Sequence, residues 1–178
     1  MRIRRLLVVL VSAIVASATT IIPASIERLT TESSHVVEAT AVGAWSQWNP
    51  QRSLIFTYTR FRISRSLKGQ APATIVVKQI GGSAEGYTQK VAGVRHWQTG
   101  EQAVLFLRPS QSRDGTLEVT GLMQGNFRMK ASPTGIEVSN GVAGVTAYDV
   151  SSQVTTSYRG GGMRLEELES RVKKVVGQ

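Results

Sequence analysis

The sequence has 178 residues, no cysteine, and 21 lysines and arginines against 12 acidic residues, which gives a formal net charge of +9. This length suggests one domain, and the lack of cysteine excludes disulfides, thiol chemistry, zinc–thiolate sites and iron–sulfur clusters. A basic balance favours anionic partners: cell-wall polymers, lipid headgroups, nucleic acid or an acidic protein. A moderate net charge can also serve only to keep a protein in solution.

Residues 1–18 predict a secretory signal peptide. Three arginines near the start precede the apolar run Leu6–Val15, which is shorter than the ~20 residues that a bilayer-spanning helix needs. Ala16, Ser17 and Ala18 have the small-x-small form that signal peptidases cleave after. We therefore expect cleavage near Ala18, a secreted or periplasmic location, and no integral membrane segment in the mature chain. A retained N-terminal anchor is the alternative.

The next segments predict a short helix and three strands. Residues 25–34 fit a helix with Ser25 as N-cap and with Ile26 and Leu29 on one face. Strand patterns follow over 35–45, with a bulge or bend at Gly43, and over 54–67 and 73–80. Turn signals at 49–53 and 68–72 separate them.

The middle of the chain predicts further antiparallel strands after a long connection. Residues 81–100 are rich in glycine, and 101–108 is apolar on both faces, as in a central buried strand. Turn and strand signals continue through residue 140. We expect a mainly β fold, in which residues 19–140 form a small closed Greek-key barrel of the oligonucleotide/oligosaccharide-binding (OB) type. Closure would also account for the lack of an obvious guard on any edge strand.

The end of the chain predicts a connection and a helix. Residues 141–162 are small, polar and glycine-ended, which favours an extended strap or a flexible linker. Residues 163–178 fit an amphipathic helix with Leu165, Leu168, Val172 and Val175 on one face. We expect this helix to dock on its own domain. The alternative is a helix that binds a partner or a second copy.

Several of these segments carry a family resemblance. The pattern runs from "LTTESSHVVEATAVGAW" through "SLKG", "IVVKQIGG", "GEQAVLFLR" and "VTGLMQGNFRM" to "LEELESRV". It resembles a group of uncharacterised secreted bacterial OB-like domains, chiefly over 29–130. More distantly, it is similar to the netrin/tissue-inhibitor-of-metalloproteinase class of barrels. The resemblance implies a fold and no chemistry.

The chain departs from the family pattern at three points. Ser34 and Glu38 stand where the family opening has aspartate and glycine. The animal inhibitors present an N-terminal cysteine to a catalytic zinc, and this chain has no cysteine. That inhibitory mechanism therefore transfers to no residue here.

No catalytic pattern emerges from the sequence. His35 and His96 lack the spacing of metal ligands, no G-x-S-x-G is present, and the acids of the barrel region are scattered. The stretch 91–108 combines His96, Trp97 and Glu101, but Glu101 follows a turn into the central strand, and we expect Trp97 to plug a barrel end. We predict no enzymatic activity, no cofactor and no metal site.

One candidate binding face remains. Alternation along 54–67 puts Phe56, Tyr58, Arg60 and Arg62 on one side of a strand, with Lys78 beside them on the next strand. OB barrels bind extended polymers on such aromatic and basic faces. Alternatively, a terminal helix covers Phe56 and Tyr58 and the arginines are ordinary solvated charges. Trp45 and Trp48 form a second candidate patch.

These observations favour a secreted or periplasmic, non-enzymatic binding module. One alternative is an inhibitor or accessory protein of a secreted protease, by analogy of fold alone. Another is a module that binds nucleic acid or an anionic polymer through the basic and aromatic face. The partner is unknown; a secreted protein and an anionic polymer both fit.

Overall fold

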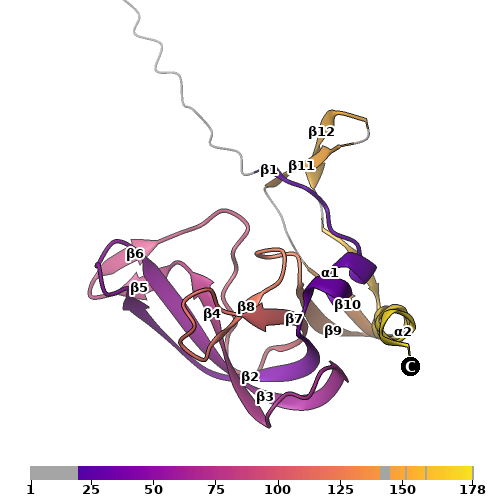
Figure 1. Ribbon diagram of the computed structural model, residues 1–178, viewed down its shortest axis with the longest axis horizontal. Helices are drawn as coiled ribbons and strands as arrows, with labels where there is room; N and C mark the ends of the chain where they lie inside the picture. The colour runs from indigo at the N-terminus through magenta and orange to yellow at the C-terminus, as the bar shows by residue number, and fades with distance from the viewer. Residues whose placement is uncertain (1–19, 141–144, 151, 159, 178) are drawn as a thin grey trace, which may run out of the picture.

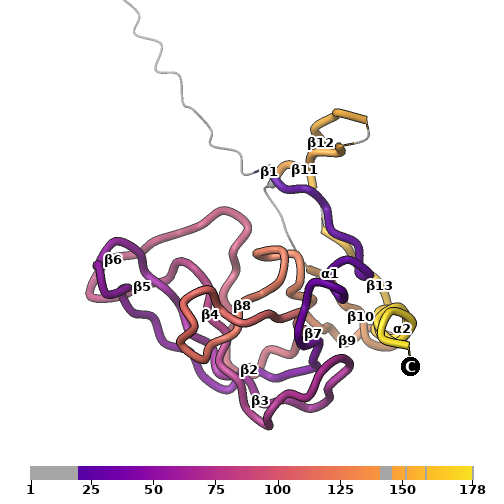
Figure 2. Tube along the Cα trace, in the orientation of Figure 1, coloured from indigo at the N-terminus to yellow at the C-terminus, as the bar shows by residue number. Residues whose placement is uncertain are grey.

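The computed structural model describes residues 20–140, 145–150, 152–158 and 160–177, and it is mainly β (Figures 1 and 2). The predicted signal peptide lies outside the described residues. Within them, no helix is both long enough and apolar enough to cross a membrane.

Five strands close into a barrel, as the sequence predicted. These are β2 (His35–Trp48), β3 (Ile55–Lys68), β4 (Thr74–Ile80), β7 (Gln102–Pro109) and β8 (Leu117–Val119). β2 pairs antiparallel with both β3 and β7, and β3 pairs antiparallel with β4. β8 closes the ring because it pairs parallel with β4 at Val77 and Leu117 and antiparallel with β7. Around the barrel, the strands therefore stand in the chain order first, second, third, fifth, fourth.

The barrel interior follows the alternation of its strands. On β3, Ile55, Thr57, Thr59 and Phe61 are buried, since every second side chain of a strand points to the same face. Trp97 is buried among the barrel residues, as expected, with its ring edge-to-face with Phe61 at 4.9 Å. Such aromatic pairs add stability beyond the area they bury.

A second hydrophobic core lies between the outer side of the barrel and two helices (Figure 1). Three strands extend the sheet beyond β7: β9 (Asn126–Ser132), β10 (Gly135–Ser139) and β13 (Gly162–Arg164). α1 (Ile26–Glu32) begins after Ser25, whose Oγ accepts a hydrogen bond from the Arg28 amide.

The C-terminal helix α2 (Leu165–Val176) docks on its own chain. Its apolar face packs with α1 and β7 in a cluster that includes Leu29, Val36, Phe106, Leu168 and Val172. Arg171 also donates two hydrogen bonds, of 2.8 and 2.9 Å, to the Glu27 carboxylate of α1. Three members of the predicted apolar face, Leu165, Leu168 and Val172, are thus buried against the same domain, whereas the fourth, Val175, is 37% exposed.

A small three-stranded sheet projects from the body, as both views show (Figures 1 and 2). The sequence suggested an extended strap or flexible linker over 141–162. In the described part of that segment, β11 (Val145–Asp149) and β12 (Val154–Tyr158) form a hairpin, and β1 (Thr20–Ile21) pairs parallel with β11. The base of this sheet is held to the body, since the side-chain Nδ2 of Asn140 donates a hydrogen bond to the Tyr158 hydroxyl at 3.2 Å.

The long connection between β4 and β7 also contains a hairpin. It consists of β5 (Gly82–Ala84) and β6 (Tyr87–Gln89) and packs against the inner face of the β2–β3 ribbon. Gly82 has φ 129°, and a Cβ there would lie 2.2 Å from Thr57 Oγ1. This close approach therefore requires glycine at that position.

Candidate functional site

Three neighbouring strands present an aromatic and cationic row on the outside of the barrel. Trp45 of β2 lies opposite Tyr58 of β3, and Tyr58 lies opposite Lys78 of β4. The rings of Trp45 and Tyr58 stack at 5.4 Å with an interplanar angle of 11°. Lys78 Nζ lies 4.5 Å from the ring centroid of Phe56 and 5.7 Å from that of Tyr58. We call Trp45, Phe56, Tyr58, Arg60 and Lys78 the ring–cation row.

Arg60 completes the ring–cation row on its other side. Its guanidinium carbon lies 5.8 Å from the Trp45 ring centroid, within the range of a cation–π contact. Arg62 projects one step further along the same face, in register with Thr40 and Thr74. Both arginines are exposed, and neither forms an ion pair with any of the described residues. The side chains named from the sequence therefore lie on one side of the sheet, with Arg62 at the margin.

The helices lie at the other end of β3 (Figure 1). There, Arg65 pairs with Glu38 of β2 and Glu169 of α2. Trp45 remains 41% exposed, and no residue of α1 or α2 lines the hollows beside Tyr58. Of the second candidate patch, Trp45 therefore joins the β3 face in one surface. Its companion Trp48 instead packs edge-on against Tyr87 of β6, with ring centroids 5.6 Å apart.

Two hollows adjoin along this surface. One, of about 570 Å³, is lined by Trp45, Tyr58 and the loop that follows β7. The other, of about 760 Å³, is lined by Trp48, Lys78 and the turn between β2 and β3. They share Gln47, Tyr58 and Asp114 as lining residues. Together they make a groove that runs beside strands β2, β3 and β4.

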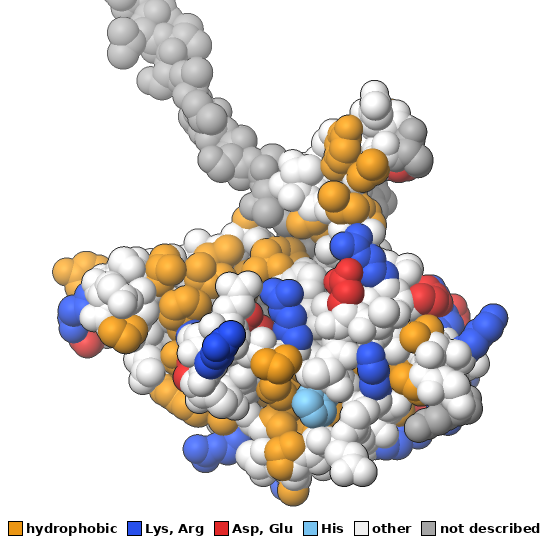
Figure 3. Space-filling view, viewed as in Figure 1, with side chains coloured by type: hydrophobic (Ala, Val, Ile, Leu, Met, Phe, Trp, Pro, Cys, Tyr) orange, Lys and Arg blue, Asp and Glu red, His pale blue; other side chains and the backbone are white. Residues whose placement is uncertain are grey.

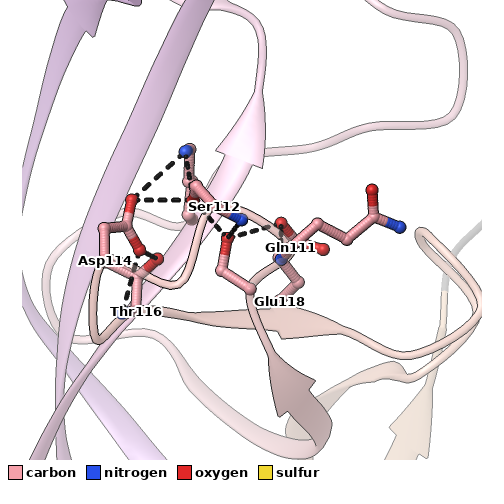
Figure 4. A network of polar contacts seen from close by, with 7 residues as sticks. Gln111, Ser112, Asp114, Thr116 and Glu118 are labelled. Carbon is pink, nitrogen blue, oxygen red and sulfur yellow. Dashed lines mark hydrogen bonds and ion pairs between the residues drawn. The ribbon is translucent and has the colours of Figure 1, made fainter.

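The loop between β7 and β8 forms one wall of this groove, and its own hydrogen bonds hold it in place (Figure 4). The Asp114 carboxylate accepts from the Thr116 amide at 3.1 Å and from the Ser112 hydroxyl at 2.9 Å. Lys78 Nζ donates to Ser112 Oγ at 2.9 Å, so the loop is joined to β4. The Thr116 hydroxyl, with Ser112 and Lys78, holds the pKa of Asp114 well below its usual range, against the effect of burial.

The turn between β2 and β3 forms the opposite wall. Asn49 Oδ1 accepts hydrogen bonds from the amides of Ser53 and Leu54. The Arg52 guanidinium lies 5.7 Å from the Trp48 ring centroid and pairs with Glu85 of the β5–β6 turn. Figure 3 shows hydrophobic side chains gathered at this end of the molecule and again on the projecting hairpin. The sequence alone did not point to either wall, because both depend on contacts between distant segments.

The histidine-containing stretch 91–108 has a structural role. Glu101 accepts from the Gln98 amide at 2.7 Å and pairs with Arg95 and Arg128. Burial alone would raise the pKa of Glu101, but the Gln98 amide and the two arginines hold it below its ordinary value. His96 is half-buried, with Nε2 3.2 Å from the Ile80 carbonyl oxygen, and burial lowers its pKa. These contacts fasten the loop across the barrel end.

The described residues contain no group of three or more His, Asp or Glu side chains placed to bind a metal ion. No known protein family matches this chain, and no curated protein sequence matches it. The ring–cation row and the groove are therefore the features of the described residues that bear on function.

Proposed function

We propose that the protein is a secreted, non-enzymatic binding module with an OB-like barrel, and that it holds an extended anionic partner on the outer β2–β3–β4 face. The order of the barrel strands and the parallel pairing of β4 with β8 support the OB-like assignment. In OB barrels, the face of the second and third strands and the two loops beside it bind extended polymers. Here those elements are β3, β4 and the two walls of the groove.

The observation that carries this proposal is the ring–cation row, in which Trp45 and Arg60 are exposed. The Lys78 side chain is only 11% exposed and pairs with Asp114, so the arginines supply the accessible charge. Stacked aromatic rings offer contacts to planar or apolar groups, and cations beside them attract negative charge. Arg60 and Arg62 are exposed and free of ion pairs within the described residues. An anionic partner would therefore displace no internal salt bridge when it contacts them.

The test is binding to three labelled anionic chains: poly-L-glutamate, heparin and a single-stranded oligonucleotide. We expect at least one to bind, with an affinity that falls as salt rises, because each neutralised charge releases counterions. The double change Arg60→Ala/Arg62→Ala should lower that affinity by about tenfold or more, at about 1.4 kcal/mol per tenfold. The matched control is Lys173→Ala/Lys174→Ala, which removes the same charge from the exposed side of α2.

Two results would count against this function. If none of the three chains binds at low salt, the face is ordinary surface. If the arginine and lysine double variants lose affinity equally, only net charge matters and the ring–cation row is not the site. The protease-inhibitor alternative receives no specific support, because the chain offers no cysteine to a catalytic zinc.

A further inference from the structure

The long strand β2 changes its environment at Ala41. Residues Val36–Thr40 pair with β3 on one side and with β7 on the other. At Ala41 the backbone still bonds to Gly100 and Glu101, at 2.8 and 2.9 Å. Beyond it, Val42–Trp48 pair with no strand of the described residues other than β3. We call the side of Val42–Trp48 that faces away from β3 the free edge. Barrel closure, which was expected to leave few edges to guard, ends before this segment.

The hydrogen-bonding groups of the free edge can be assigned from the ladder. The Asn49 amide donates to the Leu54 carbonyl at 2.8 Å, so this pair is hydrogen-bonded. Hydrogen-bonded and non-hydrogen-bonded pairs alternate along an antiparallel ladder. Trp45 is therefore bonded to β3, whereas Ala44 and Ser46 turn their N–H and C=O groups to the free edge. Four backbone groups in strand geometry thus flank Trp45.

This edge lacks the usual protection against strand addition. Proteins commonly guard exposed edges with charges, proline or a covering element. The segment reads "VGAWSQW", with no charge and no proline. Val42 and Trp45 are 39% and 41% exposed, and Ala44 is also exposed. A Cβ added at Gly43 would find no atom within 4 Å, so the approach to the edge is open.

The charge beside the free edge indicates what kind of strand fits. Arg60 reaches from β3 across β2 to the Trp45 ring, and Gly43, opposite Arg60 in register, has no side chain in its way. Strands lie about 4.8 Å apart, so a side chain on an added strand would come within reach of this guanidinium. A carboxylate would complement Arg60, which forms no ion pair within the described residues.

We propose that the free edge of β2 binds an extended polypeptide with acidic side chains, which adds to the sheet as a further strand. Main-chain hydrogen bonds to Ala44 and Ser46 hold the peptide, while Trp45 and Arg60 contact its side chains on the outer face. This inference rests on the proposed function, because it uses the same surface and names its anionic partner as a polypeptide.

The test uses a labelled heptapeptide of alternating glutamate and valine, measured by fluorescence anisotropy with the full mature chain. Two further peptides carry N-methyl groups on one or the other alternating set of backbone nitrogens. A strand added to one edge points only every second backbone N–H group toward that edge, so only one of the two alternating sets forms hydrogen bonds with β2. We expect the parent peptide and one methylated form to bind, and the other form to bind at least about tenfold more weakly. Equal binding of both methylated forms overturns the inference.

A matched pair of protein variants tests the same edge. Ala44→Pro removes an N–H that points away from β3, and proline is tolerated at such edge positions. Ala44→Val keeps the N–H and adds bulk. We expect the first change to weaken peptide binding about tenfold or more and the second to leave it nearly unchanged. Thermal unfolding of both variants checks that the barrel is intact. If Ala44→Pro fails to fold, the binding of the two methylated peptides to the unchanged protein still tests strand addition at the free edge.

The remaining outcomes separate this inference from the proposed function. If heparin or the oligonucleotide binds in an Arg60-dependent way and the acidic peptide does not, the inference fails and the proposed function stands. If no anionic probe binds, both fail. If the chain dimerises in sedimentation and Ala44→Pro makes it monomeric, a second copy occupies the edge and the inference is overturned.

Discussion

The two halves of the β2–β3 ribbon differ in burial, in strand pairing and in the polarity of their interior. In the first half of β2, Val36, Val37 and Ala39 are at most 2% exposed, because the barrel covers one face and the helices the other. In the second half, Val42 and Trp45 are exposed, and one edge has no partner strand in the described residues. The same two strands thus change from a buried element to an open surface.

The interior of the open half is also different. It contains Thr57 and Thr59 of β3 and Gln79 of β4 in place of the aliphatic side chains of the closed half. Within the described residues, Thr59 Oγ1 and Gln79 Oε1 are buried without a hydrogen-bond partner. Buried polar atoms without partners cost stability. We infer that the closed half stabilises the fold, and that the open half has a composition that stability alone does not explain.

The largest contrast should come from one substitution made in each half. Ala39→Asp places a charge in a site that is 2% exposed, and an uncompensated buried charge costs about 3–5 kcal/mol or prevents folding. Ala44→Asp, in the open half of the same strand, should change stability by about 0.5 kcal/mol or less. Urea unfolding of both variants measures the difference. Comparable losses would show that Ala44 is not on an open edge.

The covering of the closed half by α2 can be tested in the same way. Leu168 is fully buried, so Leu168→Ala should reduce the free energy of unfolding by about 2–4 kcal/mol. Val175, on the same helix, is 37% exposed, and Val175→Ala should cost less than about 1 kcal/mol. Equal and small effects in denaturant unfolding would indicate that the helix does not dock on its own domain.

Trp45 should matter for binding much more than for folding. Trp45→Ala removes the stacked partner of Tyr58 from an exposed position, and loss of a stacking platform costs about 1–3 kcal/mol of binding. We expect the affinity for the anionic probe that binds best to fall by about fivefold to 150-fold, with only a small change in melting temperature. Unchanged affinity in anisotropy titrations would remove Trp45 from the site.

The smallest effect concerns pH and the contact between α1 and α2. The hydrogen bonds from Arg171, with smaller contributions from a backbone hydrogen bond and from Ser25, lower the pKa of Glu27 from its ordinary 4.5 to about 2. A carboxyl whose pKa is depressed in the folded state stabilises the fold above about pH 4.5, and this contribution is lost as the pH falls toward 2. Glu27 is half exposed, so the contribution is at most about 1 kcal/mol. Arg171→Gln should raise the Glu27 pKa, followed by NMR, part of the way toward its ordinary value, because the backbone and Ser25 hydrogen bonds remain.

The sequence was informative wherever the spacing of apolar residues within one strand or helix determines which side chains are buried. The alternation along Leu54–Leu67 separated buried Phe61 from outward Tyr58, because the two-residue period of a strand is set within the strand. The spacing of Leu165, Leu168 and Val172 likewise gave the buried face of α2. Both patterns are read from neighbouring residues and need no knowledge of the partner element.

The sequence was less informative wherever register or distant contacts decide. Trp45 stacks on Tyr58 only because three irregularities in the β2–β3 ladder shift the register before Gly43. The segment of the β11–β12 hairpin was expected to be a strap or linker. Because β12 is almost wholly exposed, its sequence does not need the alternation of apolar and polar residues that marks a half-buried strand. The free edge of β2 is invisible in sequence, because it depends on where β7 stops pairing.

The three tryptophan indole N–H signals in an NMR titration give the most direct test of the account. Trp97 lies in the barrel core and Trp45 on the outer face, and Trp48 lies beside the β2–β3 turn. During titration with poly-L-glutamate or the acidic heptapeptide, we predict that the Trp45 signal moves, together with the Ala44 and Ser46 amides, while Trp97 stays fixed. A Trp45 signal that does not move while binding occurs would contradict the assignment of the open half as the binding surface.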